Sequence, residues 1–234
     1  MKISAVSIMT ALLTIASTTA FSAVTVEFGS TPNENGGSIT GSVNNMTLDF
    51  GELTVTNSPS SELQNARIVV EPAAIVSKTG TLPGASMYAI SPVTSTAGLK
   101  LYADVDSNGT EDLIMSGDLH IVDMITLGSG AHVSPSESLD VTNIALHNTQ
   151  LMLVHWFSIP YELITFEYVG FADLTIDLSA IPHIFSTYID NGTDLNNIEI
   201  VGTMTTEPSS VPEPAAIALF GLGFFVIRRK IRRA

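Results

Sequence analysis

The chain has 234 residues, of which 45% are hydrophobic, and its formal net charge is −14. It contains no cysteine, which excludes a disulfide framework, a thiolate metal site and a cysteine nucleophile. The span from Val24 to Ser210 holds 22 of the 23 acidic residues but only three of the nine lysines and arginines, so its formal charge is −19. Charge of this sign repels nucleic acids and anionic lipids, and we expect no nucleic-acid partner.

Residues 1–22 have the layout of a secretory signal peptide. Lys2 supplies a positive charge, an apolar run follows from Ala5 to about Ala16, and small residues lie between Ser17 and Ala20. Small side chains are what a signal peptidase accepts next to its cleavage site. The sequence therefore predicts export through the secretion machinery and removal of this segment by signal peptidase.

Residues 23–204 are predicted to form one β-rich exported domain. Short segments rich in Val, Ile, Thr, Tyr and Phe recur between Gly, Pro, Asn and Ser, and several alternate, as Leu53 and Val55 do in ELTVT. We expect an all-β fold, an antiparallel β-sandwich or jelly-roll-like single domain, with a β-solenoid as the alternative. One helical turn is expected within Ser60–Ala66. The predicted strands are 25–28, 38–43, 46–50, 52–56, 67–71, 86–90, 99–104, 112–117, 119–127, 139–146, 150–157, 163–171, 173–178 and 198–204.

The segment LYADVDSNGTEDLIM, from Leu101 to Met115, is a candidate calcium loop. It resembles the D-x-D-x-[DN]-G-x-x-D loops of calcium-binding families such as FG-GAP-type repeats, dockerins and EF-hands. Gly109 lets the chain turn, and alternate oxygens in a tight loop suit a hard cation that takes six to eight oxygen ligands. Met115 stands where an EF-hand has its bidentate glutamate, which argues against a calcium sensor. The predicted ligands are Asp104, Asp106, Asn108, Asp112 and the backbone carbonyl near Thr110.

Two other interpretations of acidic loops stay open. The calcium loop candidate is also compatible with a hairpin turn rich in Asp, Asn and Gly that binds no metal. A second stretch, YIDNGTDLNN from Tyr188 to Asn197, has irregular spacing and is interpreted as a plain turn. If calcium binds to the first loop, its expected role is structural, because the exported domain has no disulfide to stabilise it.

Catalytic motifs give a weak signal. The five histidines are scattered, and no nucleophile elbow, P-loop or dinucleotide fingerprint is present. Glu162 and Glu167 lie among Trp156, Tyr161, Phe166 and Tyr168, which is the neighbourhood most similar to a glycan site. Aromatic residues in strands are more often part of a core. No catalytic residue is assigned, and no enzyme activity is predicted, although a carboxylate-based glycan hydrolase stays open.

The last part of the chain differs from the acidic body. Residues 205–211 form a short polar spacer, and residues 212–234 begin with Pro212, Glu213 and Pro214. An apolar run from Ala215 to Ile227 follows, and as a helix it spans about 20 Å, which is short for a bilayer core of about 30 Å. The cations after it favour the cytoplasmic side. This basic anchor consists of Arg228, Arg229, Lys230, Arg232 and Arg233.

In this order of parts, the tail resembles the PEP-CTERM sorting signal of Gram-negative bacteria. The resemblance covers about a tenth of the chain. It implies transient anchoring in the inner membrane by a C-terminal transmembrane helix, followed by cleavage near Pro-Glu-Pro by an exosortase-type membrane peptidase. It also implies a final location at the cell surface or in the extracellular matrix, where many such proteins are linked to exopolysaccharide and biofilm.

These features predict a cell-surface or extracellular-matrix protein of structural or adhesion type. Extracellular polysaccharide is the expected partner, and calcium is a possible structural cofactor. The alternatives are a secreted carbohydrate-active enzyme and a lectin-like glycan-binding module. The enzyme stays open because a carboxylate-based hydrolase leaves only a faint trace in sequence.

Overall fold

The computed structural model describes residues 23–30, 36–133 and 140–206. The predicted signal peptide, the sorting motif Pro212–Pro214 and the basic anchor lie outside these residues. No helix in the described part of the chain is long and apolar enough to cross a membrane. The predicted transmembrane helix belongs to the segment that is not described.

Within the described ranges, fourteen strands, three α-helices and one 3₁₀ turn are present. The strands are β1 (Thr25–Ser30), β2 (Gly37–Ser42), β3 (Asn45–Asp49), β4 (Leu53–Asn57), β5 (Arg67–Val70), β6 (Ala73–Leu82), β7 (Ala85–Pro92), β8 (Leu99–Ala103), β9 (Asp112–Leu119), β10 (Asp123–Leu127), β11 (Gly130–Val133), β12 (Val141–Leu146), β13 (Phe171–Ser179) and β14 (Leu195–Thr205). The helical elements are η1 (Ser61–Leu63), α2 (Thr149–His155), α3 (Tyr161–Val169) and α4 (Phe185–Asn191).

All strand pairs are antiparallel, and together they form one sheet that closes on itself. The order around the closed sheet is β1-β14-β2-β3-β6-β7-β10-β11-β13-β12-β9-β8-β5-β4. The predicted all-β antiparallel fold is confirmed. Its strands are linked in one continuous sheet, whereas the predicted sandwich or jelly roll divides them between two.

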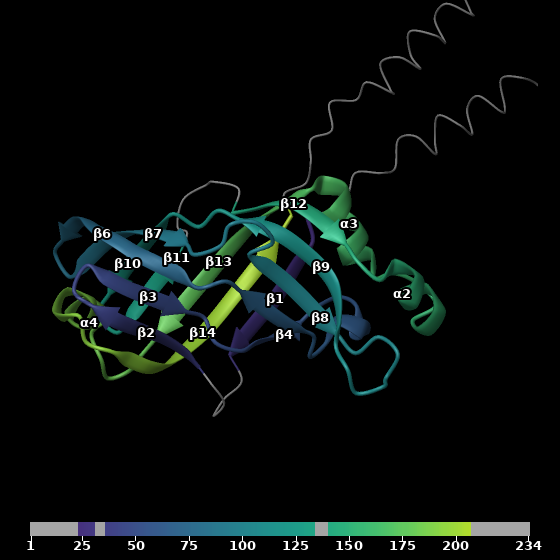
Figure 1. Ribbon diagram of the computed structural model, residues 1–234, viewed down its shortest axis with the longest axis horizontal. Helices are drawn as coiled ribbons and strands as arrows, with labels where there is room; N and C mark the ends of the chain where they lie inside the picture. Colours follow the sequence, from purple (N-terminus) through teal and green to yellow (C-terminus); the bar gives the residue numbers. More distant parts are fainter. Residues whose placement is uncertain (1–22, 31–35, 134–139, 207–234) are drawn as a thin grey trace, which may run out of the picture. The chain divides into compact units, whose positions relative to one another are not determined.

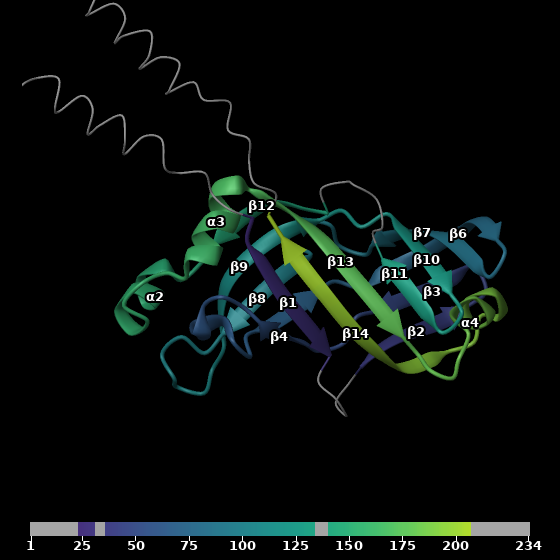
Figure 2. The same cartoon turned by 180° about the vertical axis from the view of Figure 1, so that it is seen from behind.

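The long strands β13 and β14 also pair with each other, from Asp173–Thr205 to Ser179–Glu199. The outer edge of each is shared by two partners: β14 pairs with β1 and β2, and β13 pairs with β12 and β11. The shared β13–β14 pair therefore divides the closed sheet into two rings of eight strands. Figures 1 and 2 show this pair crossing the domain between β2, β3, β6, β7, β10 and β11 on one side and β4, β8, β9 and β12 on the other.

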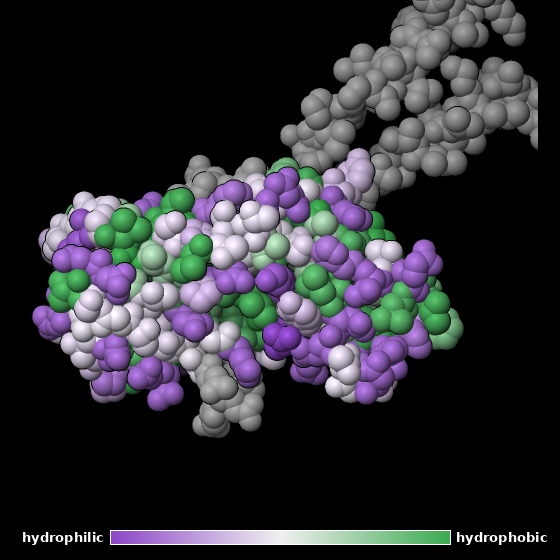
Figure 3. Space-filling view, in the orientation of Figure 1, coloured by the Kyte–Doolittle hydropathy of each residue, from purple (hydrophilic) through white to green (hydrophobic). Residues whose placement is uncertain are grey.

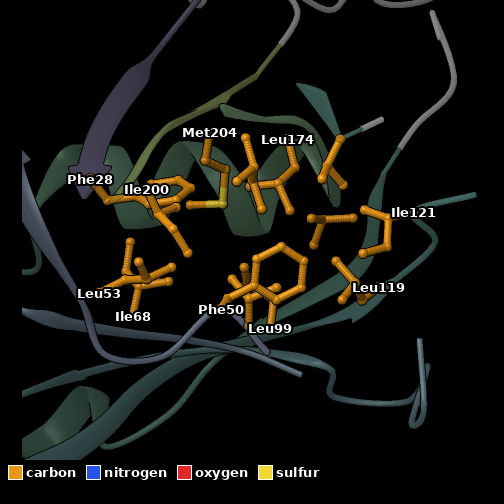
Figure 4. Close-up of a cluster of buried hydrophobic side chains, with 14 of the residues drawn as sticks. Phe28, Phe50, Leu53, Ile68, Leu99, Leu119, Ile121, Leu174, Ile200 and Met204 are labelled. Atoms are coloured by element: carbon orange, nitrogen blue, oxygen red, sulfur yellow. The ribbon is translucent and has the colours of Figure 1, made fainter. Parts of the chain in front are cut away.

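Buried hydrophobic side chains line both rings, and one dense cluster lies in the ring that contains β1, β4, β5, β8, β9 and β12. Figure 4 shows side chains from β1, β4, β5, β8, β9, β13 and β14 meeting in one cluster with Phe50 and Ile121. Leu53 and Val55 are both buried, as their alternation in ELTVT predicts. Burial of a large apolar side chain contributes about 1.5–3 kcal/mol, so this cluster stabilises a chain that has no disulfide. Its labelled members, each at most 2% exposed, are Phe28, Phe50, Leu53, Ile68, Leu99, Leu119, Ile121, Leu174, Ile200 and Met204.

Two predicted strands are wrong. Residues 150–157 and 163–171 lie mainly in α2 and α3. In α3, Glu162, Leu163, Thr165 and Phe166 are buried, which is the spacing of one helix face rather than of a strand. Pro160 precedes the helix, and Gly170 ends it in the left-handed conformation with φ 78°. The single helical turn expected within Ser60–Ala66 is confirmed as η1.

Candidate functional site

A cavity of about 240 Å³ lies where β3, β6, β7 and α4 meet. Its walls combine aliphatic side chains with one cluster of polar groups. It is smaller than the pockets of about 300–1,000 Å³ that hold drug-sized ligands, so it suits one small ligand unit. The lining residues that form the apolar wall are Val43, Met46, Ile75, Val76 and Ile189.

The polar cluster consists of Lys78, Tyr88 and Asp190. The Nζ of Lys78 lies 2.6 Å from Oδ2 of Asp190, and the hydroxyl of Tyr88 donates a hydrogen bond of 2.9 Å to Oδ1 of the same carboxylate. Lys78 Nζ is also 5.6 Å from the centroid of the Tyr88 ring, within the range of a cation–π contact. One carboxylate thus holds a cation and a phenol at the wall of the cavity.

Tyr88 is only 1% exposed, and its surroundings favour the neutral phenol. Burial raises the pKa of Tyr88 far above its ordinary value, and the hydrogen bond and negative charge of Asp190 raise it further. Because the folded-state pKa lies above the unfolded one, this contribution to stability is present below about pH 10 and is lost as the pH rises above that value. At neutral pH the hydroxyl is therefore a hydrogen-bond donor.

Backbone irregularities place these groups. In β6, the register against β7 shifts between Ile75 and Ser77 and again between Lys78 and Gly80. Such bulges redirect side chains, and Lys78 lies between the two. Gly192, with φ 62°, ends α4 so close to the backbone of Val43 that a Cβ would collide with the nitrogen of that residue. This contact holds Asp190 beside the cavity.

The sequence did not identify this cavity. Lys78 is one of only three cations in the body, which is the signal that singles it out. Asp190 belongs to the stretch Tyr188–Asn197, interpreted from the sequence as a plain turn. In the structure, that stretch contains the end of α4, its left-handed cap at Gly192 and the start of β14.

The predicted calcium loop is folded as a series of bends between β8 and β9. The carboxylate of Asp104 accepts hydrogen bonds from the backbone nitrogens of Asn108 (3.0 Å) and Gly109 (2.9 Å), and Asp106 accepts from Asn108. Asn108 Oδ1 accepts from Thr110 N at 2.7 Å. Asp112 is the first residue of β9. Among the described residues, no group of three or more His, Asp or Glu side chains lies close enough to hold a metal. Calcium binding to this loop stays a prediction.

A thermal shift tests calcium binding to this loop. If calcium binds, millimolar calcium raises the Tm of the parent protein relative to chelator, because a ligand stabilises the state that binds it. The variant Asp104→Asn with Asp106→Asn keeps an oxygen acceptor at each position but loses both charges, so its Tm is expected not to respond. Differential scanning calorimetry with and without chelator measures both. An identical Tm of the parent protein under both conditions would show that calcium does not bind to this loop.

The predicted glycan neighbourhood on α3 is divided between two faces of the helix. Glu162 and Phe166 are 0% exposed, whereas Tyr161 and Tyr168 are 52% and 61% exposed. Glu167 is exposed, and its carboxylate accepts a hydrogen bond from the backbone of Leu146 at 3.3 Å. The structure therefore does not bring Glu162 and Glu167 together on one surface.

Glu162 accepts a set of buried and half-buried hydrogen bonds that the sequence did not indicate. Its carboxylate accepts hydrogen bonds from Ser60 N at 2.6 Å, Ser60 Oγ at 2.5 Å and Ser58 Oγ at 3.3 Å. Because 102 residues separate Glu162 from Ser60, these bonds fasten α3 to the loop before η1. A buried carboxylate is stable only with such partners.

All three cations of the described part form ion pairs. Arg67 pairs with Glu111, Lys78 with Asp190, and Lys100 with Glu71. The acidic side chains of the body far outnumber these three cations. The surface charge is strongly negative, which favours solubility and attraction of divalent cations.

Comparison with known proteins identifies one part of the chain. Residues 210–233 match the family model of the PEP-CTERM protein-sorting motif. The predicted resemblance of the tail is thus confirmed: the chain carries the sorting motif of exported proteins that are anchored transiently by the C-terminus and processed by exosortase. No curated protein and no solved structure matches the chain.

Proposed function

We propose that this protein is a structural or adhesion component of the cell surface or extracellular polysaccharide matrix of a Gram-negative bacterium. The sorting motif at residues 210–233 carries the proposal, because this motif is characteristic of exported proteins. Two features support a matrix role. The body forms one closed sheet around an apolar core, and its few cations are all paired. An anionic body of this kind binds divalent cations, which also bridge acidic polysaccharides.

A glycan-binding module is the second candidate, and the cavity beside α4 favours it. Lys78 supplies hydrogen-bond donors, Asp190 supplies acceptors, and aliphatic side chains form the adjoining wall. A sugar ring presents the same combination of hydroxyl groups and apolar faces. The cavity volume of about 240 Å³ suits a single sugar unit at the end of a chain or on a branch.

Deleting the gene in the producing bacterium tests the matrix role. We expect the deletion strain to retain less extracellular matrix, and the wild-type gene to restore it. Two double variants then separate the candidates. The variant Lys78→Ala with Asp190→Ala removes the ion pair at the cavity, and its matched control, Lys100→Ala with Glu71→Ala, removes an ion pair elsewhere. The dry mass of isolated matrix is the measurement.

The outcomes distinguish the two candidates. Restoration by both double variants supports a structural component whose cavity is not required. Failure of the cavity variant alone, with normal amounts of the protein outside the cell, supports glycan binding at Lys78 and Asp190. An unchanged matrix in the deletion strain would contradict both.

A further inference from the structure

The outer faces of α2 and α3 expose an unusual concentration of apolar side chains. Phe157, in the connection between the two helices, is 90% exposed. Figure 3 shows hydrophobic side chains at the end of the domain where Figure 1 places α2. We call this surface the α2–α3 patch; its members are Leu153, Val154, Phe157, Tyr161, Ile164 and Tyr168.

Helix α3 is apolar on both sides. Its inner face packs Leu163 and Phe166 into the core. Its outer face carries Tyr161, Ile164 and Tyr168, which follow the spacing of one helical stripe. A surface helix normally has polar residues on the face that points to water. A helix that is apolar on both faces is normally covered on both, by the protein core or by a membrane.

The patch also lacks the charge of the rest of the body. Between Thr149 and Gly170 there is no lysine or arginine, and the two acidic residues are Glu162 and Glu167. Glu162 is fully buried, so Glu167 is the one exposed carboxylate of this segment. In a body with formal charge −19, this is a surface that can approach an apolar phase without desolvating many charges.

The place where the chain leaves the domain indicates which apolar phase the patch meets. Strand β14 ends beside the start of β13, where Asp173 pairs with Thr205, and α3 ends just before β13 at Val169. The chain therefore leaves the domain next to α3. Only residues 207–214 separate Thr206 from the apolar run that begins at Ala215. Eight extended residues span at most roughly 26–29 Å.

We propose that the α2–α3 patch rests on the surface of the lipid bilayer that holds the C-terminal segment. The short spacer keeps this end of the domain near the bilayer for as long as the tail is inserted. Tyrosine is enriched at the membrane–water interface, and an apolar helix face is buried there to a depth of about 5–10 Å. Docking fixes the body against the membrane and holds Pro212, Glu213 and Pro214 at its surface, where a membrane peptidase acts.

Trp156 provides a direct test, because it is the only tryptophan and precedes Phe157. The full chain is reconstituted through its tail into phosphatidylcholine vesicles, with and without brominated acyl chains, which quench nearby tryptophan. Neutral lipid avoids repulsion by the acidic body. We expect quenching of Trp156 in the parent protein and at least a twofold loss of quenching in Val154→Ser with Phe157→Ser. The matched control, Leu82→Ser with Leu127→Ser, removes exposed leucines of β6 and β10 and is expected to keep full quenching.

Three results would overturn the proposal. The first is that Trp156 of the parent protein is not quenched. The second is that Trp156 is quenched equally in the patch variant and in the control. The third is a detergent-solubilised dimer that the patch variant alone dissociates in sedimentation, because a second copy of the chain would then cover the patch. Far-ultraviolet circular dichroism of each variant verifies that these exposed substitutions leave the fold intact.

Discussion

Replacing Glu162 by alanine is expected to lower the free energy of unfolding by about 3 kcal/mol. The carboxylate is fully buried and accepts three hydrogen bonds from Ser58 and Ser60. Alanine would remove the acceptor of the buried Ser58 hydroxyl and of the half-buried N–H and hydroxyl of Ser60. An unpaired buried donor costs about 1–3 kcal/mol, and a half-buried one costs less. For a domain of this size, the loss corresponds to a fall in Tm of about 6–12 °C. Urea denaturation and calorimetry measure both quantities.

Two variants control for other causes. Glu167→Ala changes the same helix at an exposed position with one hydrogen bond of 3.3 Å, and its expected loss is below about 1 kcal/mol. Glu162→Gln keeps a side chain of the same size that both accepts and donates hydrogen bonds, so it should recover more than half of the lost stability. If Glu162→Ala unfolds at the same urea concentration as Glu167→Ala, the hydrogen bonds of Glu162 do not fasten α3.

Replacing Pro212, Glu213 and Pro214 by alanine is expected to trap the protein in the inner membrane. The apolar run and the cations remain, so insertion is unchanged, but the segment that identifies the cleavage site is gone. Proline keeps a peptide free of helical hydrogen bonds, whereas alanine favours helix formation. We expect at least a tenfold loss of protein outside the cell, measured by fractionation and immunoblotting.

The control for this change lies a few residues upstream. Glu207→Ala with Pro208→Ala and Ser209→Ala removes a second Glu-Pro pair that lies outside the matched residues 210–233. This variant is expected to be released normally. Release of the Pro212–Pro214 variant at the parental rate would show that the motif is not read in this chain.

Most strands of the body were predictable, whereas β6, β11 and the helices α2, α3 and α4 were not. Alternation in segments such as Leu53–Asn57 gives a period of two that only a strand explains. The segment from Gln150 to Phe157 is apolar at almost every position, so its period does not separate a buried strand from a short helix. Pro160 and Gly170, which bound α3, were the readable helix signals. Closure of the sheet depends on long-range pairing, such as that of β1 with β14, which leaves no local pattern.

The tail was predictable from the sequence, whereas the cavity and the burial of Glu162 were not. The tail was predictable because its signal is a local order of residues that a membrane and a peptidase read without a folded domain. The cavity depends on Tyr88 and Asp190, which are 102 residues apart and meet only when α4 folds against β7. Nothing in the sequence distinguishes Glu162 from an exposed acidic residue. Its burial is explained by its hydrogen bonds to Ser60, which is distant in the sequence.

The sorting motif predicts that this body is exported, anchored by its tail and released by cleavage at the motif. The intact mass of the protein recovered outside the producing cell tests it most directly. We predict a mass that lacks both residues 1–22 and the apolar and basic tail, with a new C-terminus at or next to Pro212–Pro214. A protein that is found outside the cell and still ends at Ala234 would show that release does not require cleavage at the motif.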